Sequence, residues 1–284
     1  MKKQQLYLLA GGTLLLILLL VFGNTVAKKD PIASLPSAIE GKETFDIDHF
    51  LADSKQKLTV NQANYIAKIE NSVSRGDVKS QQEQAFTKLA YFWRDSIDNH
   101  ELYVFYISKA ASLVNSEKNL TFAARQILRE VKAEEKPALK GWKAEVAISL
   151  FEKAIAINPE NDSLKVEMAS CYVFGKGMTG DAQETMKGIQ QLLQVVKKDS
   201  TNMQAQLVLG IGGVVSTQYE KAVSRLETVV KNQPNNMEAI TWLAQAYEAK
   251  GDKSAAIKWY QYSKRIANNP LYSKEVDQHI KQLQ

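Results

Sequence analysis

The sequence predicts an all-α protein, a right-handed superhelical solenoid of antiparallel helix pairs preceded by one transmembrane helix. An internal repeat of about 34 residues predicts the solenoid, and so do apolar residues at helical spacing. An uncharged apolar segment near the amino terminus predicts the membrane helix. A single helix pair cannot bury its apolar face, so each pair needs neighbours, and the stack leaves surfaces free to bind other molecules.

The first expected element is a signal-anchor helix in residues 1–27. Residues 6–22 hold nine leucines and no charged residue. The apolar stretch 6–27 would span roughly 33 Å as a helix, close to the ~30 Å hydrocarbon core of a bilayer. We therefore expect it to stay in the membrane as an uncleaved anchor. A cleaved signal peptide, with small residues at 25–27 as the cleavage site, is the alternative.

The charges that flank this segment favour a cytoplasmic amino terminus. Lys2 and Lys3 face Lys28 and Lys29, but the free amino group and Asp30 shift the balance. The expected location is the inner (cytoplasmic) membrane as a single-pass protein. The repeat domain would then lie in the periplasm of a Gram-negative cell.

Two short regions are expected between the membrane helix and the repeats. Residues 28–44 contain Pro31, Pro36 and Gly41 with little periodicity, which indicates a flexible tether. Residues 45–83 show apolar residues at helical spacing and predict two amphipathic capping helices.

The repeat array is predicted to cover residues 84–270, and a capping helix over 271–284 is expected to cover its open end. Units 203–236 and 237–270 keep the regular period, whereas the earlier units are diverged. One diverged unit shows a charged insertion over 129–143, where Pro137 and Gly141 mark an interruption.

Specific residues in the last two units carry a resemblance to a known family. In 237–270 they are Leu243, Ala244, Tyr247, Gly251, Asp252, Ala256, Tyr260 and Ser263, and in 203–236 they are Leu209, Gly210, Ala222, Leu226 and Pro234. These units resemble the tetratricopeptide repeat. Unit 203–236 departs from the family pattern, because Gly213 replaces an aromatic residue and the turn 216–219 lacks glycine. Residues 172–178 also resemble a Sel1-like repeat, with a glycine-containing loop between helices.

The resemblance implies a concave groove that holds a protein or a peptide. By their position in the repeat, the residues expected to line this partner-binding groove are Val166, Ser170, Val173, Leu207, Ile211, Val214, Thr241, Gln245 and Glu248. Mostly apolar residues at these positions suit an amphipathic helix or an extended apolar segment. The alternative is that the apolar ones pack against the array's own helices.

The charge balance argues against nucleic acid as a partner. The chain carries 36 basic and 31 acidic residues, but four of the basic residues flank the apolar segment. Without those four the excess is a single charge, whereas a nucleic-acid-binding domain needs a basic surface.

The sequence shows no convincing catalytic, cofactor or metal site. The glycines of 175–180 follow a helix and not a strand, so a dinucleotide site is not expected and a flexible loop between helices is favoured. His49, His100 and His279 lie far apart along the chain, and Cys171 in an apolar stretch is expected to be a buried small hydrophobe. We therefore predict a protein that is not an enzyme, with no cofactor, no metal and no small-molecule substrate.

The function these features predict is a membrane-anchored protein–protein interaction scaffold or adaptor. We expect it to support assembly of an envelope protein complex, with a protein or peptide partner in the concave groove. The alternative function is a structural oligomerisation spacer without a peptide-binding groove.

Overall fold

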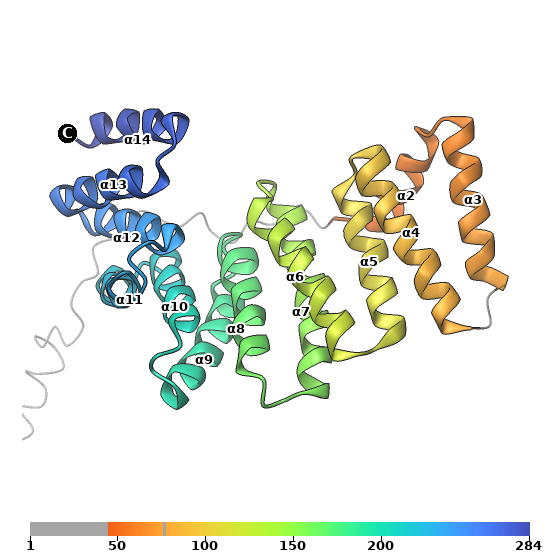
Figure 1. Cartoon of the computed structure of the whole chain (residues 1–284), viewed down its shortest axis with the longest axis horizontal. Helices are drawn as coiled ribbons and strands as arrows, with labels where there is room; N and C mark the ends of the chain where they lie inside the picture. The colour runs from red at the N-terminus through yellow and green to blue at the C-terminus, as the bar shows by residue number, and fades with distance from the viewer. Residues whose placement is uncertain (1–44, 76–77) are drawn as a thin grey trace, which may run out of the picture. The chain divides into compact units, whose positions relative to one another are not determined.

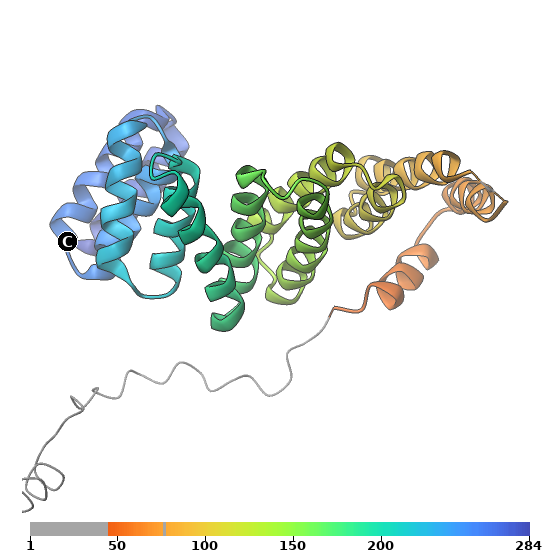
Figure 2. The same ribbon diagram turned by 90° about the horizontal axis from the view of Figure 1, so that it is seen from below.

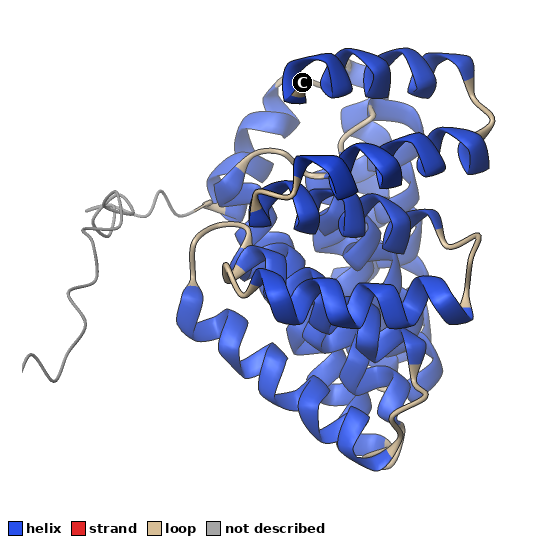
Figure 3. Ribbon diagram, turned by 90° about the vertical axis from the view of Figure 1, so that its left-hand side faces the viewer, coloured by secondary structure: helices blue, strands red, loops and turns tan. Residues whose placement is uncertain are grey.

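A computed structural model describes residues 45–75 and 78–284. This part of the chain contains thirteen α-helices and one π-helical segment, and no strand (Figure 1, Figure 3). The elements are α2 (Ile47–Gln56), α3 (Val60–Arg75), α4 (Lys79–Ile97), α5 (His100–Val114), α6 (Glu117–Ala133), α7 (Pro137–Ile157), α8 (Asp162–Cys171), η1 (Tyr172–Gly177), α9 (Ala182–Lys198), α10 (Met203–Val215), α11 (Tyr219–Asn232), α12 (Met237–Lys250), α13 (Lys253–Ala267) and α14 (Pro270–Leu283).

The predicted membrane helix of residues 1–27 and the tether of residues 28–44 lie outside the described residues. None of the helices in the described part of the chain has both the length and the apolar character needed to cross a bilayer.

The helices pack as successive antiparallel pairs. The most extensive contacts join α4 to α5, α6 to α7, α10 to α11 and α12 to α13, while α9 packs against both α8 and η1. Each pair also contacts the next one along the chain. The predicted all-helical solenoid is therefore confirmed for the described residues, whereas its right-handed sense stays a prediction.

Polar caps explain where many of these helices begin. Asn202 Oδ1 accepts the backbone N–H of Ala205 at 3.0 Å, and Asn236 Oδ1 accepts that of Ala239 at the same distance. Asp252 caps α13 in the same way through Ala255. A side chain that satisfies one of the four unpaired N–H groups of a helix start fixes the first turn. The 34-residue repeat is thus visible in the caps of α10 and α12.

The predicted charged insertion over 129–143 is not an interruption of the fold. Helix α6 continues to Ala133, α7 begins at Pro137, and only residues 134–136 link the two. Proline fits the first turn of a helix, where its missing N–H has no partner to lose. Gly141 lies inside α7 with no atom within 4 Å of where a Cβ would stand. The insertion was predicted from residues that in fact start a helix.

The glycine-containing run after Cys171 is also more ordered in structure than the predicted loop. Residues Tyr172–Gly177 continue α8 as a π-helix, and the chain turns only after Gly177. A Cβ on Gly175 would stand 2.2 Å from the Cβ of Ala144 on α7, so glycine allows this close approach. Cys171 itself is fully buried, as expected, and burial raises the pKa of its thiol.

A buried ionic cluster joins α5, α6 and α7. The Lys143 side chain is 3 % exposed, and its ammonium lies 2.7 Å from Glu134, 3.4 Å from Glu101 and 3.9 Å from Glu130. His100 Nδ1 lies 3.0 Å from Glu130. Burial alone would raise the pKa of Glu134, but hydrogen bonds from Lys143 and the Lys136 N–H hold that pKa below its usual value. The cluster replaces water around one ammonium with three carboxylates.

Candidate protein-interaction surface

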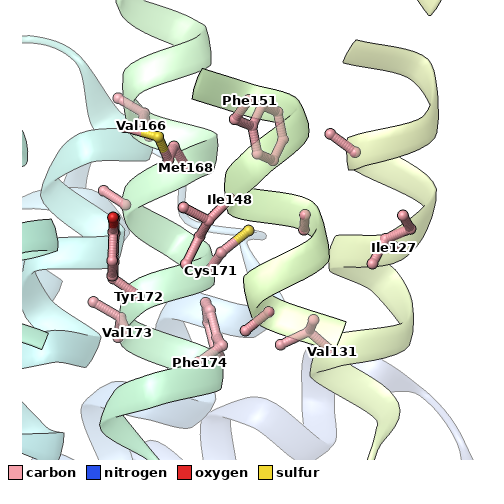
Figure 4. Close-up of a cluster of buried hydrophobic side chains, with 14 of the residues drawn as sticks. Ile127, Val131, Ile148, Phe151, Val166, Met168, Cys171, Tyr172, Val173 and Phe174 are labelled. Atoms are coloured by element: carbon pink, nitrogen blue, oxygen red, sulfur yellow. The ribbon is translucent and has the colours of Figure 1, made fainter. Parts of the chain in front are cut away.

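Five of the nine predicted groove residues are buried. Val166, Ser170 and Val173 on α8 and η1, and Leu207 and Ile211 on α10, are each at most 4 % exposed. Figure 4 shows Val166 and Val173 in the buried cluster that also contains Ile148 and Phe151 of α7. These five side chains pack against the chain's own helices, in line with the alternative interpretation of the apolar groove positions. None of the five therefore offers a free contact surface in this structure.

The other four predicted residues keep partial exposure. Val214 lies in the last turn of α10, while Thr241 and Gln245 lie one turn apart on α12. Glu248 is occupied, because its Oε2 accepts from Tyr260 Oη at 2.7 Å and lies 2.8 Å from His279 Nε2. Burial would raise the pKa of Glu248, but these hydrogen bonds hold it below its usual value. Thr241 and Gln245 are therefore the predicted residues best placed to meet a partner.

The burial has a geometric cause. The first helices of successive pairs, α6, α8, α10 and α12, contact one another, so the positions that face along this row are covered by the next helix. Lys132 on α6 forms an ion pair at 2.8 Å with Glu238 on α12, 106 residues away in sequence. The row therefore brings α6 and α12 within reach of each other's side chains.

The side chains that meet there form what we call the α6–α12 strip, which consists of the partly exposed Lys132, Glu238 and Trp242 and of Phe174, which is buried beneath them. The Lys132 ammonium lies 4.3 Å from the centre of the Phe174 ring, and the Phe174 and Trp242 rings are 6.4 Å apart, edge to face. Cation–π and aromatic contacts of this kind add to the ion pair. The strip is one connected set from α6, η1 and α12.

The strip is partly open to solvent. The Lys132 and Glu238 side chains are 34 % and 38 % exposed, and Trp242 is half-buried beside Thr241. A half-exposed tryptophan offers a large apolar contact area at a low entropy cost, and a surface ion pair is weak enough to exchange partners. The strip therefore offers an apolar contact and a charged contact side by side.

Sequence reasoning missed the four residues of the strip. It assigned groove positions by spacing within each unit and so could not show that α6 and α12 approach each other. Lys132 lay in the supposed insertion, and Phe174 lay in the supposed loop. Trp242 did carry a signal, because it is a large aromatic residue next to the predicted Thr241 on the first helix of a regular unit.

Two of the three histidines are hydrogen-bond partners between packed helices. His100 pairs with Glu130 and His279 with Glu248, while His49 on α2 is exposed. Across residues 45–75 and 78–284, no three histidine, cysteine or acidic side chains are grouped so that they could hold a metal ion.

Comparison with known proteins identifies the repeat in part of the chain. Residues 214–270 match the family model of the tetratricopeptide repeat. This segment runs from the end of α10 through α13, and it confirms the resemblance that the sequence shows there. The match does not reach residues 172–178, so the Sel1-like unit stays a prediction. No curated protein matches this sequence.

Solved structures with a similar fold include the MamA protein, with a TM-score of 0.43 and 14% identity over 66% of this chain and 92% of that one. YrrB, described as a TPR protein with an unusual peptide-binding site, has a TM-score of 0.42 and 15% identity over 68% of this chain and 91% of that one. A tetratricopeptide repeat protein from Parabacteroides merdae ATCC 43184 has a TM-score of 0.36 and 14% identity, covering 78% of this chain and 96% of that one.

Proposed function

We propose that this chain is a protein–protein interaction scaffold, anchored in the inner membrane by residues 6–27, whose helical domain recruits a protein partner to an envelope complex from the periplasmic side. The observation that carries the proposal is the α6–α12 strip on a domain with tetratricopeptide repeats. The membrane segment is supported by its length and lack of charge. The partner segment would be a peptide that inserts an apolar side chain beside Trp242.

The chemistry of the strip supports a polar as well as an apolar contact. Lys132 and Glu238 neutralise each other in the free protein, so a charged residue of the partner can pair with one of them without leaving a buried charge behind. Thr241 and Gln245, partly exposed on the same helix as Trp242, can donate and accept hydrogen bonds. A mixed surface of this kind gives specificity through pairing and affinity through the aromatic ring.

The test is capture of partners from detergent-solubilised membranes by the full chain and by its Trp242→Ala variant. We expect Trp242→Ala to weaken the binding of a specific partner by about 2 kcal/mol or more, as for an interface hot spot. This corresponds to a roughly 30-fold higher dissociation constant. Phe122→Ala, which removes a half-exposed ring elsewhere on α6, is the matched control. If the variant captures the same partners as strongly as the wild type does, the strip is not the binding surface.

The topology is tested separately with a reporter fused after Gln284. A reporter active only outside the cytoplasm supports the periplasmic placement. A cytoplasmic signal would leave the scaffold function standing and overturn the envelope assignment.

The packing of the carboxyl-terminal helix gives less support to the alternative function, an oligomerisation spacer. Helix α14 buries Val276, Ile280 and Leu283 against the preceding helix pair. Most of its other side chains are polar, which suits a helix that closes an array better than one that joins two copies. Only Leu271, at 75 % exposure, offers a large apolar group there.

A further inference from the structure

Helix α2 is attached to the rest of the domain differently from every other described helix. Figure 2 shows it to one side of the row formed by α3, α4 and α5. Ser54 is its only buried residue, whereas its apolar residues Ile47, Phe50 and Leu51 are only partly covered. They recur at helical spacing, so α2 is an amphipathic helix that rests on a surface without being enclosed by it.

The surface under α2 comes from three helices. Phe45, just before α2, packs edge to face on Trp142 of α7, with ring centres 5.0 Å apart, and also contacts Phe50 at 5.2 Å. Lys55, at the other end of α2, lies 2.7 Å from Glu70 of α3. We call Trp142 and Glu70, with Tyr106 of α5, the α2 seat.

The seat has support that does not depend on α2. Tyr106 Oη donates to Glu70 Oε1 at 3.1 Å, which holds the carboxylate from α5. Burial, followed by the charge of Glu70, raises the pKa of Tyr106, so the phenol stays protonated as a donor. Trp142 lies on α7, the longest helix described, and next to the buried Lys143. The seat therefore keeps its groups in place if α2 leaves.

Helix α2 can also leave without unravelling α3. Asp46 caps α2, accepting the N–H groups of Asp48 and His49 at 3.0 Å each. The start of α3 has its own reciprocal cap, in which Thr59 N–H donates to Gln62 Oε1 at 3.0 Å and Gln62 N–H donates back to Thr59 Oγ1 at 3.4 Å. Two self-capped helices joined by residues 57–59 form a natural hinge.

We infer that the α2 seat is a docking site for an amphipathic helix of a protein partner, and that α2 occupies it in cis as a competitor. The occupant is defined by what residues 45–55 present: an aromatic ring just before the helix, apolar residues at positions 47, 50 and 51 on one face of α2, and a lysine near its end. The Phe45 ring meets Trp142, and Lys55 meets Glu70. Recognition of an amphipathic helix through such spaced anchors is a known mode of peptide binding. The seat is separate from the α6–α12 strip, so either proposal can fail alone.

The test uses a fluorescently labelled peptide with the sequence of residues 45–58 and the full chain in detergent. In the wild type the tethered α2 competes at high local concentration, so the added peptide binds poorly. Phe45→Ala combined with Lys55→Ala vacates the seat, and we expect the peptide to bind this variant at least about tenfold more tightly. Adding Trp142→Ala to that variant should abolish the gain, whereas adding Phe122→Ala should not.

Hydrogen exchange on the wild-type chain gives a second, independent measurement. Amides of α2 should exchange faster than those of α5 and α7 by at least about tenfold, because α2 opens without global unfolding. A vacated variant that keeps its helical circular dichroism but binds no peptide would overturn the inference. So would α2 amides that exchange as slowly as those of α5.

Discussion

Helices α5 to α7 and helices α10 to α13 meet the same need, close packing of antiparallel helices, with different groups. Between α5, α6 and α7 a buried ammonium, Lys143, is surrounded by carboxylates. Between α10 and α11 the contact depends on size, because a Cβ on Gly210 would stand 2.6 Å from Leu226. Ala222, Ala244 and Ala256 continue this small-residue packing at 0 % exposure.

This contrast explains why the packing of α10–α13 could be predicted from the sequence and that of α5–α7 could not. Small residues recur at a fixed spacing in α10–α13, because every pair repeats the same close approach. An ionic cluster has no period, since its members come from whichever helices happen to converge. The regular region is therefore visible in the sequence, and the ionic one only in three dimensions.

Removing the ammonium should give the largest effect on stability. Lys143→Ala leaves Glu101, Glu130 and Glu134 close together without their central cation, and breaking a buried ion pair in this way costs about 3–5 kcal/mol. Urea denaturation of the variant measures the loss. Lys153→Ala, an exposed lysine on the same helix, should change stability by no more than about 0.5 kcal/mol. Equal effects of the two variants would show that the cluster does not hold α5–α7 together.

Adding one methyl group at the η1–α7 contact should have the next largest effect. Gly175→Ala places a Cβ against Ala144, and overpacking of this kind costs about 1–3 kcal/mol. Gly141→Ala is the matched control on α7, where nothing lies within 4 Å, and it should stabilise the helix by about 0.5–1 kcal/mol. Thermal unfolding of both variants compares them, and opposite signs are expected.

The cluster also predicts a dependence on pH. The pKa of Glu134 is lower in the folded chain than its usual value, so its charged form contributes stability above the unfolded pKa, about 4.3, and loses it as pH falls through the folded pKa. Glu134→Gln should therefore cost about 1–3 kcal/mol at pH 7 and progressively less below about pH 4. Denaturation of wild type and variant at several pH values measures the difference.

A constant difference between wild type and Glu134→Gln from pH 7 down to acid would contradict the assigned charge pairing. Glu152→Gln, on the exposed face of α7, provides the control for acid effects on the rest of the domain.

The caps should give the smallest and most uniform effects. Asn202→Ala and Asn236→Ala each remove one 3.0 Å cap bond at equivalent positions and should each cost about 1 kcal/mol. Helix α4 begins after Val78 with no side-chain cap, in an extended conformation that suits one, so Val78→Asp should stabilise the domain by up to about 1 kcal/mol. Calorimetric unfolding compares the three, and strongly unequal losses at 202 and 236 would show that the two units are not equivalent.

The repeats and helix starts of the carboxyl-terminal region could be predicted because local groups decide them. Met203 and Met237 each follow an asparagine that caps the helix, and the same small residues recur 34 positions later. The supposed insertion at 129–143 failed for the opposite reason. Pro137 and Gly141 break helices in some settings, but here proline starts α7 and glycine lies in open space.

The candidate site could be predicted only in part. Thr241 and Gln245 kept exposure on α12, whereas Val173 and Ile211 were covered by neighbouring helices. Repeat position predicts which face of a helix points toward the groove. The spacing and angle between neighbouring helix pairs decide whether that face is open. Contacts such as the ion pair of Lys132 with Glu238 join distant units, so one unit alone does not show this arrangement.

The helical character of the described part of the chain, the pairing of its helices in order and the starts of the regular pairs could all be predicted from the sequence. Periodicity, caps and small residues act over a few positions, so they are written locally. The three-dimensional packing alone shows that α6 meets α12, that Lys143 is enclosed by three carboxylates, and that residues 45–56 rest on α3, α5 and α7. Those contacts depend on the sum of many small rotations between successive helix pairs, and no single unit of the sequence encodes that sum.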